Sequence, residues 1–472
     1  MTTRTSAPGE AASSALTWAV TVGAVFMTTL DTYVVTVAVP DLSSDFNHAS
    51  VSHVSWVLNA YAIAMTAILI VAGRQGDRYG SKSVFLLGTV LFTLASAACA
   101  LAPGLAFLII ARAVQGVGAA AQLPASLALL LAAVPAERRQ HAARLWTGFA
   151  AMGAVFGPLV GGLLVEASWR YVFAINLPLG IATFLVGRRV LPDTRVRKDA
   201  AAPDMTGSLL LIVSVATLTG ALVQAPDWGW SAVQTVALLV VAAVSGAGFV
   251  WRCRTHPAPL IEPSMMRNRT YTISNVANLL FSVAYGIMLL SVTLWCQQVW
   301  HYSALRTGFA LAPAPFVVLP AAVVSAGLIR RLGLGPVAAL GGVVYAASAL
   351  WLVLGVHDTP DYAFGMLPTM VASGVGFALG SATLTGGAVS ALPPAQAGTA
   401  TSIVNAGRQV SGCLGVAVLV TVIGTAPAPS DIHHLFNVGW CVATGLALLS
   451  AVVALSLKKP ARVEQPELLS AA

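Results

Sequence analysis

Long apolar runs separated by short polar segments make up most of this chain. A helix that crosses a membrane needs about 20 mostly apolar residues, and fourteen runs approach or exceed that length. Their residues do not alternate between apolar and polar, as the strands of a membrane barrel do. Because backbone groups in lipid must be satisfied within the segment, we predict fourteen transmembrane helices. The runs cover residues 17–40, 52–73, 83–101, 106–133, 143–165, 171–190, 206–224, 232–251, 273–296, 304–327, 335–355, 363–388, 397–424 and 434–457.

The hydrophilic segments divide these runs into groups. The longest two bracket one pair of runs, which predicts two six-helix bundles with two extra central helices between them. Such a plan, with a site between two packed halves, is known for transporters. The predicted order is a cytoplasmic tail (1–16), an N-terminal bundle (17–190), a linker (191–205), the extra helices (206–251), a linker (252–272), a C-terminal bundle (273–457) and a cytoplasmic tail (458–472).

Basic residues support the same helix count. Of the 25 Lys and Arg, 21 fall in the tails and in one set of alternate loops. Arg170 and Arg306 fall in the other set, and Arg112 and Arg408 lie inside apolar runs. Because positive loops stay in the cytoplasm, we expect both termini to be cytoplasmic, in a bacterial inner membrane. The first apolar run lacks a cleavage site behind it and is expected to remain in the mature protein.

Composition agrees with a membrane protein. The 472 residues are 57% hydrophobic and 9% charged, against about 25% charged in a soluble domain. The net charge of +8 follows from the cytoplasmic loops, so we expect no nucleic-acid partner. The five cysteines form no CxxC pair, and we expect neither a metal site nor a cofactor.

Enzyme motifs are missing from the sequence. HExxH, GxSxG and the phosphate-binding GxxxxGK[ST] do not occur, so we expect no catalytic residues. The last absence also argues against an ATP-driven pump, unless a separate subunit supplies the ATPase. A proton gradient is then the expected energy source.

Four segments resemble signatures of one transporter family. "GRQGDRYGSK" (73–82) resembles the loop signature of the major facilitator superfamily, although Gln75 and Ser81 depart from it. "LIIARAVQGVGAA" (108–120) matches the helix-4 signature, and "GAVFGPLVGG" (153–162) matches the helix-5 signature of its antiporters. "LDTYVVTVAVP" (30–40) resembles the helix-1 signature of the fourteen-helix drug:proton antiporters, with Tyr33, Thr36 and Val39 as departures. The resemblance, over about residues 17–457, implies proton-coupled drug efflux by alternating access.

One acidic residue lies well inside an apolar run, namely Asp31. An ionised carboxylate is costly in hydrocarbon, and burial raises its pKa toward physiological pH. Arg112 lies near the start of the fourth run, in the outer half of the membrane as Asp31 does, so the two side chains are predicted to approach each other. Our hypothesis is that Asp31 carries the coupling proton and Arg112 tunes it. A static ion pair that holds two helices together is the alternative.

Two groups of residues are candidates for a conformational switch. In the fifth run, small residues allow a neighbouring helix to approach closely, and a proline bends the helix. The alternative is that these residues serve only static helix packing. In the 73–82 loop, an acid and a base are candidates for a cytoplasmic latch, or for a solvated turn. The residues are Gly153, Gly157, Pro158, Gly161 and Gly162, and Gly73, Asp77, Arg78 and Gly80.

A wall of aromatic and neutral polar residues is predicted for the substrate cavity. Arg408 is a second buried base without an evident acid. It could bind backbone carbonyls, line a wet cavity or face an anionic part of a substrate. The predicted cavity residues are Tyr33, Trp56, Asn59, Tyr61, Gln122, Trp146, Asn278, Tyr285 and Arg408.

Two functions fit these features. The first is a proton-driven exporter of a drug or antibiotic, as in antibiotic self-resistance; the second is a nutrient or metabolite carrier of the same fold. The helix-5 signature favours export. With a single membrane acid, we expect neutral, weakly basic or zwitterionic amphiphiles rather than dications. We expect a monomer whose partners are this small molecule, protons and the lipid bilayer.

Overall fold

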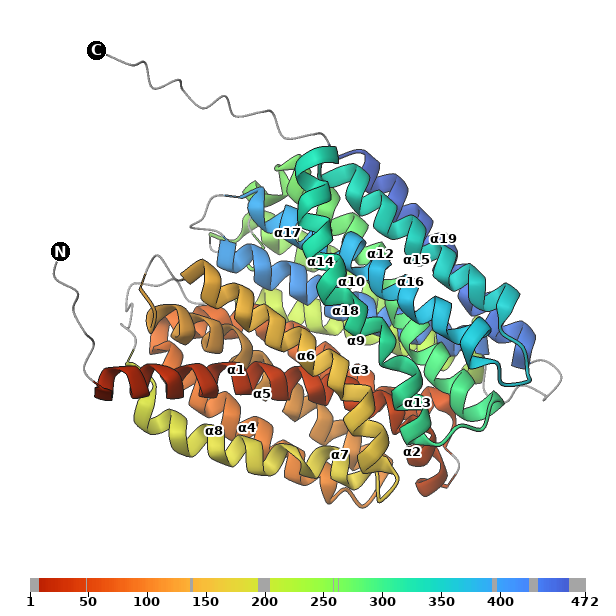
Figure 1. The fold of residues 1–472 in the computed structure, drawn as a ribbon, viewed down its shortest axis with the longest axis horizontal. Helices are drawn as coiled ribbons and strands as arrows, with labels where there is room; N and C mark the ends of the chain where they lie inside the picture. The colour runs from red at the N-terminus through yellow and green to blue at the C-terminus, as the bar shows by residue number, and fades with distance from the viewer. Residues whose placement is uncertain are drawn as a thin grey trace, which may run out of the picture.

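A computed structural model describes residues 8–47, 49–135, 139–193, 204–257, 259–261, 263–392, 397–423 and 432–457. Every regular element in these ranges is a helix, as predicted. Figure 1 shows the N-terminal helices packed together in one group and the C-terminal helices in a second group beside it.

The N-terminal part contains eight helices among the described residues. A proline at the start of α2 and a Gly80 with φ of +90° between α3 and α4 explain two of the breaks, since Gly adopts positive φ without strain. Ser50 caps α3, because its side chain accepts from the His53 N–H. The helices are α1 (Pro8–Val37), α2 (Val39–Asp45), α3 (Val51–Tyr79), α4 (Ser81–Ala100), α5 (Leu105–Ala132), α6 (Arg139–Val165), α7 (Arg170–Ala174) and α8 (Asn176–Val190).

The rest of the described chain continues with helices, three of them of the wider π type. Of these, η4 lies within a longer helical run, between α16 and α17, whereas η2 ends the run that α12 begins and η3 begins the run that α16 continues. A π segment shifts the register of the side chains along such a run. The elements are α9 (Met205–Trp228), α10 (Val233–Thr255), α11 (Pro263–Met266), α12 (Arg269–Leu294), η2 (Trp295–Val299), α13 (Ala304–Leu311), α14 (Pro313–Leu332), α15 (Leu334–Gly355), η3 (Tyr362–Met366), α16 (Leu367–Phe377), η4 (Ala378–Ala382), α17 (Thr383–Ser390), α18 (Ala397–Ile423) and α19 (Ile432–Leu455).

Helices occupy all fourteen predicted apolar runs in the described part of the chain. Twelve helical segments there are long and apolar enough to cross a membrane, and α3 and α6 are helices of 29 and 27 residues beside them. Some boundaries were wrong. The helix of the first run ends at Val37 rather than at residue 40, because Pro40 lies in the first turn of the separate short helix α2. Helix α3 continues beyond residue 73 to Tyr79.

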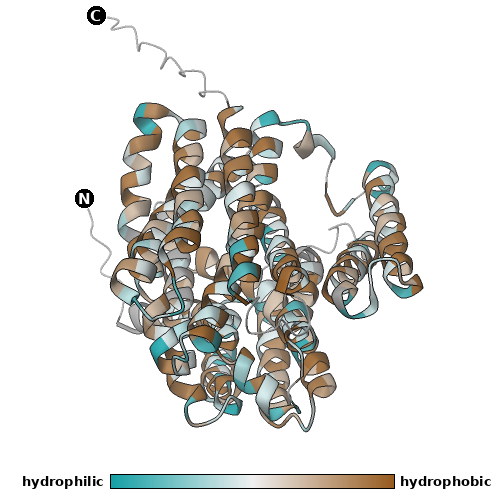
Figure 2. Cartoon of the chain, turned by 90° about the vertical axis from the view of Figure 1, so that its right-hand side faces the viewer, coloured by the Kyte–Doolittle hydropathy of each residue, from teal (hydrophilic) through white to brown (hydrophobic). Residues whose placement is uncertain are grey.

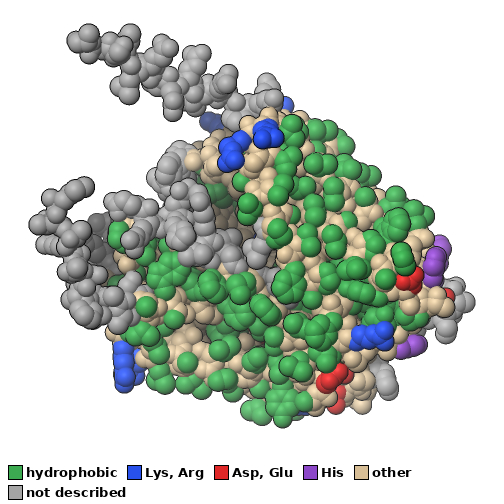
Figure 3. All heavy atoms as spheres, viewed as in Figure 1, with side chains coloured by type: hydrophobic (Ala, Val, Ile, Leu, Met, Phe, Trp, Pro, Cys, Tyr) green, Lys and Arg blue, Asp and Glu red, His purple; other side chains and the backbone are tan. Residues whose placement is uncertain are grey.

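The outer surface is apolar. Large hydrophobic side chains such as Leu87, Val233 and Val323 are exposed, as expected where lipid replaces water. Hydrophobic residues run along the helices, and hydrophilic residues gather at several helix ends (Figure 2). Hydrophobic side chains also cover most of the face in Figure 3, with Lys and Arg at its edges.

The two ends of the helices differ in charge. We call the end with Lys82, Arg188, Arg189, Arg330 and Arg331 the basic end. The opposite end carries Arg170 and Arg306.

The two groups of helices meet along two seams. Helix α6 packs against α13, and α3 packs against α18. Helix α9 contacts both α3 and α18, and α10 packs on α9. The helices of the second seam carry the cavity described below.

Candidate functional site

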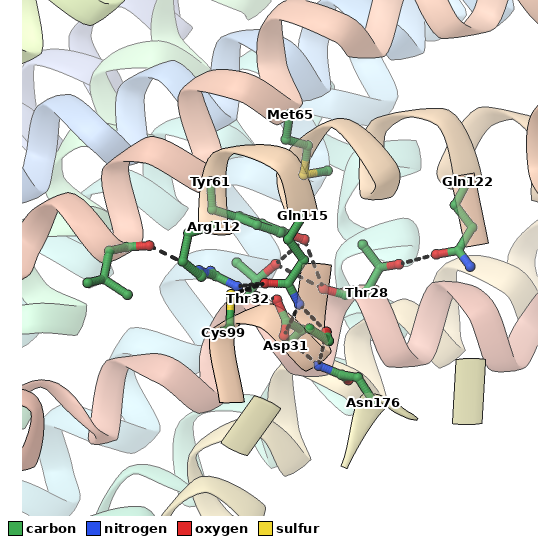
Figure 4. Close-up of polar contacts among 12 residues, drawn as sticks. Thr28, Asp31, Thr32, Tyr61, Met65, Cys99, Arg112, Gln115, Gln122 and Asn176 are labelled. Carbon is green, nitrogen blue, oxygen red and sulfur yellow. Dashed lines mark hydrogen bonds and ion pairs between the residues drawn. The ribbon is translucent and has the colours of Figure 1, made fainter. Parts of the chain in front are cut away.

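Asp31 is the centre of a buried polar network between four helices (Figure 4). Arg112 Nη1 donates to Asp31 Oδ2 at 2.7 Å. The side-chain amides of Gln115 and Asn176 donate to Asp31 Oδ1 at 2.9 and 2.7 Å. Ser96 Oγ accepts from both amides, at 2.5 and 3.2 Å. The prediction that Asp31 and Arg112 meet is confirmed, and the side chains of all five residues are buried.

Each member reaches the network from a particular helix. Asp31 lies near the end of α1, and Arg112 and Gln115 lie one turn apart on α5. Asn176 begins α8, where the short break after α7 turns its side chain toward Asp31. Asn176 and Gln115 were not predicted as site residues. The signal available in the sequence was that each is polar within or beside an apolar run.

Arg112 is held on all sides. Its Nε donates to the Val57 carbonyl at 3.0 Å, and Nη1 also donates to Gln115 Oε1 at 2.6 Å. Its guanidinium lies 4.1 Å from the centre of the Tyr61 ring and 5.6 Å from that of Phe173. A buried charge is tolerated only when it is paired and hydrogen-bonded, and this guanidinium is both.

A cavity lies beside this network, between α1, α3, α12 and α18. It encloses about 830 Å³ of space free of protein atoms, including its mouth. Arg112 borders the cavity, whereas Asp31 lies behind Arg112 and has no exposed surface. Five of the predicted cavity residues line it with Arg112, namely Tyr33, Asn59, Tyr61, Tyr285 and Arg408.

The other four predicted cavity residues lie outside this lining. Gln122 is buried between Thr28 and Thr89, with hydrogen bonds of 2.9 and 2.8 Å. Trp146 donates to Ser126 at 3.1 Å. Asn278 accepts from Ser381 at 2.8 Å, which connects α12 to η4. Trp56 packs beside Gly220 of α9. An aromatic or amide residue in an apolar run can face several neighbours, so sequence position alone did not separate these from the cavity.

The small residues of α6 lie at two helix contacts. Gly153, Gly157 and Gly161 face α1, where an added Cβ would approach the Phe26 carbonyl oxygen to 2.7 Å, Tyr33 Cβ to 2.6 Å and the Val34 carbonyl oxygen to 2.7 Å, respectively. Gly162 faces α13, where its Cβ would lie 2.5 Å from the Ala304 carbonyl oxygen. Gly308 of α13 packs in turn against the Pro158 carbonyl. All five predicted residues of α6 therefore lie where its backbone closely approaches a neighbour.

The predicted latch lies at the basic end. Gly73 is within α3, and Gly80 joins α3 to α4. The side chains of Asp77 and Arg78 lie outside the part that the structure describes. Beside this turn, Lys82 Nζ lies 3.1 Å from the exposed Asp193 Oδ1.

Two further ion pairs lie at helix ends outside the apolar segments. At the opposite end, hydrogen bonds from Trp169 and Arg170 lower the pKa of Asp45. At the other, burial raises the pKa of Asp204, but hydrogen bonds from the Gly207 N–H and Arg252 outweigh it and lower the pKa overall. The Arg252–Asp204 pair, 2.7 Å long, connects α10 to the start of α9.

Comparison with known proteins places these features in a family. The profile of the Major Facilitator Superfamily matches residues 21–416, most of the chain and nearly all of the helices around the site. The chain belongs to the major facilitator superfamily. It is therefore a multi-pass membrane protein of a transporter family, as the four sequence signatures indicated.

Similar proteins include resistance and export proteins of Mycobacterium and Streptomyces. The multidrug resistance protein Stp of Mycobacterium tuberculosis (strain CDC 1551 / Oshkosh) is 34% identical over 402 residues, 84% of this chain and 74% of Stp. The tetracenomycin C resistance and export protein of Streptomyces glaucescens is 34% identical, over 85% and 74% of the two chains. The methylenomycin A resistance protein of Streptomyces coelicolor is 31% identical, over 90% and 88%.

Solved transporter structures share the fold at low identity. A peptide transporter of the POT family aligns with a TM-score of 0.66 at 17% identity, over 95% of this chain and 98% of its own. A D-xylose–proton symporter aligns with a TM-score of 0.68 at 15% identity, over 93% and 96%. At these identities the likeness concerns the fold alone.

Proposed function

We propose that this protein is a proton-coupled antiporter that exports a drug-like or antibiotic-like amphiphilic molecule. The observation that carries the proposal is the arrangement of Asp31, Arg112 and the cavity. Arg112 is in contact with both the cavity and the one acid buried among the described transmembrane helices. Occupation of the cavity and protonation of Asp31 therefore act on the same guanidinium.

The coupling follows from charge. When Asp31 is ionised, Arg112 and two amides hold it, and the network is neutral overall. A proton on Asp31 removes the negative charge, so Arg112 loses its counter-ion and its attraction toward α1. The freed guanidinium then favours a second arrangement of the helices, and release of the proton restores the first.

The seams supply the movement. Helix α6 contacts α13 closely through Gly162 and Gly308, where the two backbones meet without side chains between them. Such a contact can separate without any side chain having to leave a packed position. Alternating access then consists of rocking of two six-helix bundles, with α9 and α10 as the two extra helices and α3 and α6 completing fourteen spans. The basic end lies in the cytoplasm in this orientation, as do both termini.

The direction of transport is inferred from the relatives. Stp is named for multidrug resistance, and the two Streptomyces proteins for resistance to, or export of, antibiotics. The helix-5 signature at residues 153–162 also resembles exporters. A metabolite carrier of the same superfamily is the second candidate, but no contact in the cavity favours it.

Transport into inverted vesicles tests the proposal. Tetracenomycin C and methylenomycin A serve as probes, with an acid-inside pH gradient as the only energy source. We expect gradient-dependent accumulation by the natural protein and its loss in Asp31→Asn, because an amide cannot exchange the proton. The matched control is Asp45→Asn, which makes the same change at the opposite end, where Asp45 is half-exposed.

Susceptibility of a disruption strain and an overexpressing strain to the same antibiotics gives the cellular readout. Full gradient-driven transport by Asp31→Asn would refute the role of Asp31. Transport that ignores the pH gradient in the natural protein would refute proton coupling altogether.

A further inference from the structure

Two polar side chains of the cavity lack partners within the protein. Arg408, on α18, has no ion pair and no hydrogen bond to any described residue. Asn59, on α3, is 1% exposed, and neither its Oδ1 nor its Nδ2 has a hydrogen-bond partner among them. Both residues line the same cavity at the α3–α18 seam.

Arg408 differs from Arg112, the other arginine that lines this cavity. A charge within a membrane-spanning helix normally pairs with an opposite charge or faces a watery cavity. Arg112 follows the first course, since Asp31 neutralises it. Arg408 instead faces the cavity, so it gives the cavity a net positive charge. None of the described residues that line the cavity is acidic.

The surroundings of Arg408 are suited to an amphiphile. Tyr285, on α12, lines the same cavity as Arg408. Phe377 packs against the Tyr285 ring with 5.1 Å between ring centres. Leu289 and Val416 add apolar surface to the same cavity. A cation beside aromatic and aliphatic walls matches a ligand with an acidic group on an apolar or aromatic body.

We propose that the cavity binds amphiphiles that carry an acidic group, with Arg408 as the counter-ion of that group and Asn59 as a hydrogen-bond partner for a neighbouring polar group. A carboxylate, phenolate or sulfonate satisfies Arg408, whether the molecule is an anion or a zwitterion. Asn59 offers one donor and one acceptor side, which suits an amide or hydroxyl group of the ligand. This proposal rests on the proposed function, since it names the substrate class of the same cavity. It differs from the expectation drawn from the sequence: zwitterionic substrates remain, and anionic ones replace the neutral and weakly basic ones.

Equilibrium binding of a matched pair of fluorescent probes tests the proposal. Dansylglycine carries a carboxylate, and dansylglycinamide replaces it with a neutral amide of nearly the same size. Binding is measured by fluorescence with the full-length protein in phosphatidylcholine nanodiscs, after subtraction of the signal from empty nanodiscs. We expect the acid to bind about tenfold more tightly than the amide, because charge-assisted hydrogen bonds are the stronger ones.

Substitutions test whether Arg408 causes the preference for the acid over the amide. Arg408→Gln is expected to reduce the acid-to-amide preference to about twofold or less, and Arg408→Lys, which keeps the charge, to retain most of it. Asn59→Leu is expected to weaken both probes by a similar factor, because it removes no charge. Arg306→Gln is the matched control: it removes an exposed arginine at the opposite end and should keep the full preference.

Three results would overturn the proposal. They are equal affinity of the natural protein for both probes, a full acid preference in Arg408→Gln, and loss of the preference in Arg306→Gln to the same degree. Binding is measured without a gradient, so it does not depend on proton coupling. Failure of gradient-driven transport in vesicles would contradict the proposed function and leave the acid preference standing.

Discussion

The Asp31 network and the cavity beside it are both polar regions within apolar helices, but they treat their polar groups in opposite ways. In the network, both carboxylate oxygens of Asp31 and the guanidinium of Arg112 have partners within the protein. In the cavity, Asn59 and Arg408 have none among the described residues. Asn176 Oδ1 is the one atom of the network's described side chains that is buried without a partner, but the charged groups are paired. A network whose charges are paired can hold them without a ligand, whereas unpaired polar groups that line a cavity are available to a ligand's polar atoms.

The largest effect on stability is expected from Arg112→Met, which removes one partner of the buried Asp31–Arg112 ion pair. The uncompensated Asp31 carboxylate should lower the free energy of unfolding by about 3–5 kcal/mol. A thiol-reactive fluorophore can follow thermal unfolding in detergent, because Cys99, Cys296 and Cys413 are buried until the helices separate. The double variant Asp31→Asn/Arg112→Met removes both charges and should recover much of the loss. Equal destabilisation in the single and double variants would show that packing, not charge, dominates.

A smaller effect is expected from Asn176→Leu, which removes one of the two amide donors to Asp31 Oδ1. Loss of a hydrogen bond to a buried charged group should cost about 1–3 kcal/mol, measured by the same unfolding assay. Asn437→Leu is the comparison, because Asn437 lies in the first turns of α19 and its amide bonds the His433 ring of the same helix rather than a carboxylate. If Asn176→Leu were no less stable than the natural protein, the amide would not support Asp31.

A substitution in the cavity is expected to raise the stability of the protein rather than lower it. Asn59→Leu replaces an unsatisfied buried amide by an apolar side chain of similar size, so the ligand-free protein should be more stable by about 1 kcal/mol. Its transport of tetracenomycin C should fall at the same time, because the amide that lowers stability in the empty cavity is the group that binds the ligand. A less stable Asn59→Leu would mean that the amide already has a partner, and would break the contrast with the network.

The smallest effect is expected at Asp45, outside both regions. Hydrogen bonds from Trp169 and Arg170 lower its pKa, so its stabilising contribution is present above its unfolded pKa of about 3.9 and is lost as the pH falls through the lower folded value. Because the side chain is half-exposed, the contribution should stay below about 1 kcal/mol. Unfolding of Asp45→Asn and the natural protein should therefore converge only at acidic pH. A constant difference down to pH 3 would contradict this linkage.

The sequence predicted different parts of the site unequally. Asp31 and Arg112 could be paired because a lone acid and a base at the same depth of two antiparallel helices have few other partners. Gln115, Asn176 and Ser96 could not be assigned, because neutral polar residues are tolerated at many positions of membrane helices. The same reason explains why Gln122 and Trp146 were expected in the cavity and instead have partners in the N-terminal helices.

Local sequence by itself determined the helical character of the chain, the positions of its apolar runs and the ends at which basic residues gather. Those properties follow from the length of apolar segments and from the cost of unpaired backbone groups in lipid. Only the tertiary structure decided which polar groups are satisfied, because a hydrogen bond depends on distances between helices far apart in the sequence. It therefore separated Arg112, which is neutralised by Asp31, from Arg408, which faces the cavity without a partner among the described residues.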